Sequence, residues 1–343
     1  MCRQARAAWD PYAWPVGMNT LMFLGGLVLL LIGGRFLVSG AIDAARRLGV
    51  SPLLVGLTLV AWGTSAPELA LNLVSAYKGR GDLALGNVVG ANICNMALVL
   101  GVSALISPLV VETRLIRVEI WLNAAIQVGM AAVGLVIGFS AWVAGAMLAV
   151  FAVYSIWTVT AALRPGAAPA KEMDPTCVEP DVTPGTPPLS WVMIGAYFLG
   201  GLALLTGGGS LASDGASGLA IGLGVPAAVV GVTVVSIGTT LPELVTSVTA
   251  VRRGQTDLAM GNAIGSCLFN AGAIFGMAGL MAPPEVDGSL TVPLIYMGVL
   301  SLALIPIARV FKPEVSRLEG AGLLASYAGF LVYAAVRAGA VSP

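Results

Sequence analysis

Histidine is absent from this chain of 343 residues, and charged residues make up only 10% of it. Without histidine, neither a histidine-containing catalytic triad nor the commonest zinc and copper ligand is available. Soluble domains carry about 25% charged residues, whereas 57% of this chain is hydrophobic. Basic and acidic residues number 17 each, so no net charge favours a nucleic-acid partner. The composition predicts an integral membrane protein surrounded by membrane lipid.

Cysteine is also scarce, with four residues in the whole chain. Cys2, Cys94, Cys177 and Cys267 show no C-x-x-C spacing, and two of them lie in apolar runs. We therefore expect unpaired cysteines that pack as small apolar residues rather than a redox or metal motif. No other motif indicates a bound cofactor.

Long polar segments are equally few. A membrane span needs about 20 apolar residues, and ten runs qualify, near 20–42, 52–77, 82–106, 115–138, 140–163, 189–213, 226–251, 257–281, 290–309 and 318–338. The long polar insert 164–188 predicts a flexible linker between a first half, 19–163, and a second half, 189–343. Residues 1–18 predict a tail rather than a signal peptide, and Met18 is a candidate for the true start.

One stretch occurs twice, at 56–101 and at 231–276, with every paired position 175 residues apart. Glycines upstream of the stretch keep the same spacing, such as Gly26 with Gly201 and Gly33 with Gly208. Five spans in each half would place the second half in the opposite orientation. The expected fold is therefore all-α, with ten transmembrane helices arranged as two inverted five-helix repeats.

Basic residues set the expected orientation. With the N-terminus outside, eleven lysines and arginines lie on the cytoplasmic side and five lie outside, which satisfies the positive-inside rule. Both termini are then outside and the linker 164–188 is cytoplasmic. Because this short linker has no room for a regulatory domain, we expect a prokaryotic protein of the cytoplasmic membrane.

Each repeat places an acidic residue inside an interrupted span. Glu68 follows Pro67, and Glu243 follows Pro242, each five residues after a glycine. Proline and glycine break a membrane helix, and a carboxylate in the bilayer is costly enough to indicate function. Thr64 shares a helix face with Glu68, and Thr239 repeats this relation to Glu243 in the second half. Two glutamates match the charge of one divalent cation.

The following span of each repeat carries a polar stripe. Its members are Asn87, Ala91 and Asn95, repeated as Asn262, Ser266 and Asn270. Carboxylate, hydroxyl and carbonyl oxygens suit calcium or sodium, whereas zinc and copper prefer nitrogen and sulfur. For Asn87 and Asn262 we favour a role as hydrogen-bonding residues between helices.

The segments GTSAPEL and GNVVGANICN, repeated as GTTLPEL and GNAIGSCLFN, resemble the alpha repeats of the cation/calcium antiporter superfamily, the sodium/calcium exchangers. The resemblance implies a secondary active antiporter, not an enzyme, that exchanges calcium for sodium by alternating access at a central site. Coupling of calcium or another divalent cation to protons or potassium is the alternative. The implied ligands are Glu68, Glu243, Thr64, Ser65, Thr239, Thr240, Asn95, Asn270 and Ser266, with the backbone carbonyls of Ala61 and Ser236.

Several positions depart from the family pattern. Asn270 and Ala91 stand where aspartate and serine can occur, which lowers the charge of the site and removes one hydroxyl. Gly90 and Gly265 stand where the proton-coupled branch typically carries glutamate, which favours sodium. The glycine-rich first and sixth spans are the candidates for the element that moves. The oligomeric state stays open, and a monomer would suffice for a site closed within one chain.

Overall fold

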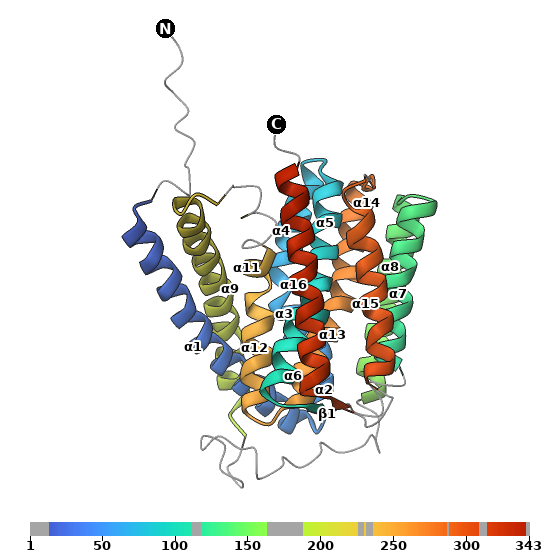
Figure 1. Cartoon of the computed structure of the whole chain (residues 1–343). Coiled ribbons are helices and arrows are strands. Elements are labelled where there is room, and N and C mark those ends of the chain that lie inside the picture. Colours follow the sequence, from blue (N-terminus) through green and yellow to red (C-terminus); the bar gives the residue numbers. More distant parts are fainter. Residues whose placement is uncertain are drawn as a thin grey trace.

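The computed structural model describes residues 14–110, 118–162, 188–225, 230, 236–286, 288–308 and 314–340. Most of the expected tail, most of the linker and most of the start of the seventh expected span therefore lie outside the described residues, and the first helix begins at Val16, within the range expected for the tail. The described chain forms a bundle of helices, with one helix pair set to the side of the rest (Figure 1). Apolar side chains such as Leu21 and Val28 are exposed on its outside. This surface suits contact with lipid.

The first half consists of helices joined by short breaks. They are α1 (Val16–Leu48), α2 (Pro52–Val55), η1 (Gly56–Val60), α3 (Ala61–Thr64), α4 (Ala66–Tyr77), α5 (Gly81–Ile93), η2 (Cys94–Val99), α6 (Leu100–Ile106), α7 (Ile120–Val136) and α8 (Ala141–Ala162). The two η elements are π-helical turns. Such turns interrupt helices most often at functional sites.

The second half follows the same order. Its helices are α9 (Trp191–Gly222), α11 (Ser236–Thr239), α12 (Leu241–Arg252), α13 (Thr256–Phe269), η6 (Asn270–Ile274), α14 (Phe275–Met281), α15 (Thr291–Ile307) and α16 (Arg317–Ala340). Two short strands, β1 (Leu109–Val110) and β2 (Glu314–Val315), pair antiparallel between the halves. The sequence did not predict this pairing.

Six described helical segments are long and apolar enough to cross a membrane. They are Val16–Leu48, Gly81–Ile106, Ala141–Ala161, Trp191–Gly222, Thr256–Met281 and Arg317–Arg337. The pair Pro52–Thr64 and Ala66–Tyr77 makes a further crossing if its 47° bend is counted as one broken span. Ile120–Val136 and Thr291–Ile307 are apolar but shorter. The count of ten crossings stays a prediction.

Glycines allow α1 and α9 to pack closely along their length. A Cβ atom on Gly26 would lie 2.6 Å from the carbonyl oxygen of Gly208, and one on Gly33 would lie 2.9 Å from that of Gly201. Small residues permit this approach in membrane helices. Gly26 and Gly201 are equivalent positions of the repeat, and so are Gly33 and Gly208. The repeat relation therefore converts the Gly26–Gly208 contact into the Gly201–Gly33 contact. Reciprocal contacts of this kind are the signature of a two-fold relation between packed elements.

The centre of the bundle is formed by the helices that follow the broken spans. Most of the apolar stretch of Gly81–Ile106, and most of that of Thr256–Met281, is buried inside the protein. Gly261 and Gly265 of α13 let this helix touch the backbone of Leu53 and Leu57 in the first half. The two repeats thus interlock at the middle of the molecule, where their polar residues meet.

Candidate ion-binding site

A break divides the polar span of each repeat. Ser65 separates α3 from α4 with φ −87° and ψ 6°, and Thr240 separates α11 from α12 with φ −93° and ψ 1°. Pro67 and Pro242 lie in the first turn of the following helix, where a missing N–H costs nothing. The predicted interruptions are confirmed. They place Glu68 and Glu243 in the first turns of α4 and α12.

The two glutamates are buried, with exposed fractions of 2% for Glu68 and 1% for Glu243. The Ser65 hydroxyl crosses between the halves and donates to Oε1 of Glu243 at 2.9 Å. Both carboxylate oxygens of Glu68 lack a hydrogen-bond partner among the described residues. A buried charge in this state is costly unless a cation joins it.

Asn95 and Asn270 come from the π-helical turns η2 and η6. The turn η2 packs against α12, which carries Glu243, and η6 packs against α4, which carries Glu68. Each amide is therefore brought to the glutamate helix of the opposite repeat. Within the described part of the chain, these two residues, Ser266 and the glutamates leave side-chain oxygens without a partner: Oε1 and Oε2 of Glu68, Oε2 of Glu243, Oδ1 of Asn95, Oγ of Ser266 and Oδ1 of Asn270.

Asn87 and Asn262 hold helices together, as predicted. Asn87 accepts a hydrogen bond from Asn72 at 3.0 Å, and Asn262 donates to Ser247 at 2.9 Å. Asn72 also donates to the backbone carbonyl of Glu68, and Asn262 to that of Glu243. Neither Asn72 nor Ser247 was among the residues predicted from the sequence. Their shared spacing of 175 residues was the available signal.

The remaining predicted ligands differ in their surroundings. The Ala61 carbonyl already accepts from the Ser65 N–H at 3.1 Å and from the Thr64 hydroxyl at 3.3 Å. The Thr64 hydroxyl also lies 3.1 Å from the carbonyl of Val60 and 3.3 Å from Oδ1 of Asn262. The Thr240 hydroxyl is buried and interacts with the thiol of Cys94.

Ser236 begins α11, and its side chain lies outside the described residues. Cys94 and Cys267 are free and buried, as expected.

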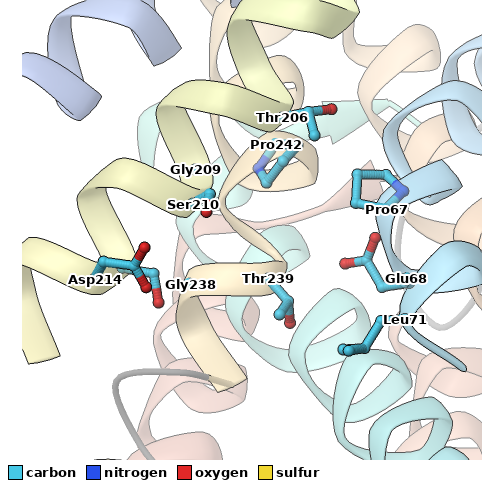
Figure 2. A pocket seen from close by; sticks show the side chains of 11 residues that line it. Pro67, Glu68, Leu71, Thr206, Gly209, Ser210, Asp214, Gly238, Thr239 and Pro242 are labelled. Atoms are coloured by element: carbon cyan, nitrogen blue, oxygen red, sulfur yellow. The ribbon is translucent and has the colours of Figure 1, made fainter. Parts of the chain in front are cut away.

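A cavity of about 320 Å³ leads to Glu68 from one side of the bundle. Figure 2 shows Glu68 on α4 opposite Thr239 and Gly238, with Asp214 of α9 at the far end. Pro67 and Pro242 also line it, so the two helix breaks face the same space. One of the two glutamates, Glu68, therefore lines the cavity and the other does not.

Oxygen chemistry dominates this site. Among the residues that the structure describes, no group of three His, Cys, Asp or Glu side chains is placed to hold a metal ion. The site instead combines two carboxylates with amide and hydroxyl oxygens. Such ligands favour calcium and other hard cations.

Comparison with known proteins identifies the family. The family model described as sodium/calcium exchanger protein matches residues 18–160 and 193–336. This chain belongs to the sodium/calcium exchanger family. The exchanger is therefore an integral membrane protein of the cation/calcium antiporters, and the resemblance drawn from its sequence is confirmed.

One curated relative and one solved structure match over most of this chain, and a second relative matches over a shorter part. CaxA of Alkalimonas amylolytica, whose name describes it as an antiporter, is 32% identical over 91% of this chain and 97% of its own. The sodium/calcium exchanger MaX1 of Methanosarcina acetivorans is 43% identical over 30% of this chain and 29% of its own. A structure of the sodium-calcium exchanger NCX_Mj, soaked with Na⁺ and Sr²⁺, has a TM-score of 0.76 at 30% identity, covering 91% of this chain and 97% of that one.

Proposed function

We propose that this protein is a secondary active antiporter that exchanges calcium for sodium across a prokaryotic cytoplasmic membrane. The observation that carries the proposal is the pair of buried glutamates, one from each repeat, each beside a helix break and linked across the halves by the hydrogen bond from Ser65 to Glu243. Membership of the sodium/calcium exchanger family supports the choice of ions. Calcium and sodium are cargo and no resident cofactor is invoked.

The proposed ligands are the oxygens that the fold leaves without partners. Glu68 and Glu243 supply charge, and Asn95, Asn270 and Ser266 supply neutral oxygens. Calcium takes 6–8 oxygens, which this set can provide with help from the other ligands proposed from the sequence. Those ligands are Thr64, Ser65, Thr239, Thr240 and the carbonyls of Ala61 and Ser236.

The proposed arrangement has two inverted five-helix halves, 19–163 and 189–343, with both termini outside and a cytoplasmic linker at 164–188. The reciprocal glycine contacts between α1 and α9 support a two-fold relation between the halves. In this arrangement the cavity beside Glu68 faces outward, because α4 runs from the break toward the outer side.

Charge neutralisation couples the two fluxes. Calcium and sodium compete for the same oxygens, so one ion set leaves before the other binds. Burying two carboxylates without a cation is unfavourable, so the empty site does not change its access readily. A loaded site loses this penalty and can move between the two access states. The pair α1 and α9 is the proposed moving element.

Uptake of calcium-45 into proteoliposomes loaded with sodium tests the function. We expect uptake that requires internal sodium and is abolished in Glu68→Gln and in Glu243→Gln. Glu319→Gln is the matched control, because Glu319 caps α16 by accepting from Ser316, away from the site. Uptake driven by a pH or potassium gradient instead would replace sodium as the counter-ion. No calcium uptake under any gradient would overturn the proposed substrate.

A further inference from the structure

A chain of buried amides extends from the ion site into the bundle. Asn270 donates from Nδ2 to Oδ1 of Asn92 at 3.1 Å, and Asn92 donates from Nδ2 to Oε1 of Gln127 at 3.1 Å. Gln127 then donates from Nε2 to Oδ1 of Asn123 at 3.1 Å. All four side chains are at most 1% exposed. The chain joins η6, α5 and α7, and the sequence analysis singled out only its first member.

The contact of Asn123, at the end of the amide chain far from the ion site, fixes the donor-to-acceptor direction of these hydrogen bonds. Asn123 points Nδ2 at the thioether sulfur of Met96, 3.5 Å away. A thioether accepts hydrogen bonds and cannot donate them, so Asn123 presents its NH₂ group there and its carbonyl to Gln127. Gln127 in turn presents its carbonyl to Asn92, so Asn92 directs its NH₂ group toward Gln127. Nδ2 of Asn92 also lies 3.4 Å from the carbonyl of Cys267. Every amide therefore donates away from the ion site.

This direction has a consequence at the other end. Because Nδ2 of Asn270 is held by Asn92, its Oδ1 is left without a partner among the described residues. Hydrogen bonds in a chain polarise one another in a low-dielectric interior. The carbonyl ends of the aligned amides all point toward the ion site, and their dipoles favour a cation there.

Asn95 occupies the position in the first repeat that is equivalent to Asn270 in the second. Neither Oδ1 nor Nδ2 of Asn95 has a described hydrogen-bond partner. The position equivalent to Asn92 is Cys267, and α15, which follows α14 as α7 follows α6, contains no asparagine or glutamine. The amide chain therefore serves Asn270 and has no counterpart for Asn95.

We propose that Asn92 and Gln127 are positioning residues that orient and polarise Asn270, so that a neutral amide acts as a cation ligand at this position. The proposal rests on the proposed function, because it assigns the strength of one ligand in the calcium site. It accounts for a site that binds a divalent cation with only two carboxylates.

Gln127→Met tests the proposal, because methionine keeps the length of the side chain and removes its amide. We expect the half-saturating calcium concentration for sodium-driven uptake to rise about tenfold, with little change in the maximal rate, as for loss of one ordered ligand. Calcium-dependent thermal stabilisation of the detergent-purified protein should weaken in parallel. Asn123→Leu should produce a smaller shift in the same direction.

The decisive arm is rescue by Asn270→Asp. A carboxylate has two equivalent oxygens and needs no orienting donor, so Asn270→Asp should restore calcium affinity in the Gln127→Met background. In the otherwise unchanged protein it should help less, because Oδ1 of Asn92 would face a carboxylate that cannot donate. This non-additivity is the mark of coupled residues.

Ser301→Ala is the matched control, because Ser301 is fully buried on α15, which packs against α7, and its hydrogen bond ends within its own helix. It should leave calcium affinity unchanged. Unchanged affinity in folded Gln127→Met and Asn123→Leu would overturn the proposal, as would a loss that Asn270→Asp does not reverse. Absence of calcium uptake by the unmodified protein would instead overturn the proposed function.

Discussion

The two repeats are alike in sequence and unlike in their surroundings. Glu243 accepts a hydrogen bond from Ser65 of the other half, whereas neither oxygen of Glu68 has a described partner. The cavity reaches Glu68 and passes Gly238 and Thr239, while Glu243 does not line it. Equivalent residues of the two repeats thus differ in hydrogen bonding and in access to the cavity in this conformation. Because both repeats carry the same motif around these glutamates, this difference between Glu68 and Glu243 lies in the conformation.

A second contrast lies at the ends of the glutamate helices. Arg253, after α12, is largely buried and donates to the Ser39 hydroxyl of α1 at 2.6 Å. The equivalent pair, Lys78 after α4 and Asp214 on α9, forms no ion pair in the described part of the chain. Asp214 instead lines the cavity. At one end of the molecule a hydrogen bond joins the end of α12 to α1, and at the other end the equivalent position on α9 borders the cavity.

Neutralising one glutamate at a time should give the largest difference in stability between the two repeats. Without sodium and calcium, Glu68→Gln should raise the free energy of unfolding by about 1–3 kcal/mol, because it replaces a buried charge that has no described donor by a neutral amide, which costs less to bury. Glu243→Gln should gain less, because Glu243 already has the Ser65 donor. Both variants should lose stabilisation by calcium, which is about 2.7 kcal/mol at 100 times Kd for a binding protein. Thermal melting in ion-free buffer measures these differences, and equal gains would refute the asymmetry.

Much of this site was accessible from the sequence because the repeat isolates it. The exact spacing singled out Glu68 and Glu243, and Gly63 with Pro67 predicted the break that the structure has at Ser65. The unequal surroundings of the glutamates could not be predicted, since equivalent motifs imply equivalent contacts.

The amide chain was missed for a related reason. Asn92 is paired with Cys267 in the second repeat, and Gln127 lies outside the repeated stretch, so the repeat does not single out either residue. Their role depends on α7 packing beside α5, which no local pattern reveals. The strand pairing of β1 with β2 was also missed, because each strand has two residues and no alternation to detect.

Glycine-to-alanine changes at equivalent positions of the α1–α9 contact should destabilise the protein equally in the two halves. A Cβ atom on Gly201 would lie 2.6 Å from the backbone nitrogen of Leu37, whereas one on Gly200 would meet nothing within 4 Å. Gly201→Ala should therefore destabilise the protein by about 1–3 kcal/mol, as overpacking does. Gly200→Ala should be neutral.

The equivalent pair in the first half provides the comparison. Gly26→Ala should be as harmful as Gly201→Ala, since its Cβ would lie 2.6 Å from the Gly208 carbonyl, and Gly25→Ala should be tolerated. Melting temperatures of the four variants measure this. A harmful change in only one half would show that the helix pair is not packed symmetrically.

The smallest expected effect concerns the end of the molecule that borders the cavity. If the halves exchange conformations during transport, Lys78 should approach Asp214 as the Arg253 contact to Ser39 is released. In a variant without Cys2 and Cys177, the pair Lys78→Cys and Asp214→Cys should cross-link slowly, and Arg253→Ala should accelerate the reaction a few-fold by freeing the opposite end. Lys78→Cys with Ser39→Cys is the control, because these positions lie near opposite ends of the bundle and should not cross-link. Cross-linking that is insensitive to Arg253→Ala would show that the two ends do not act in opposition, and the contrast between them would then be a fixed feature of the fold.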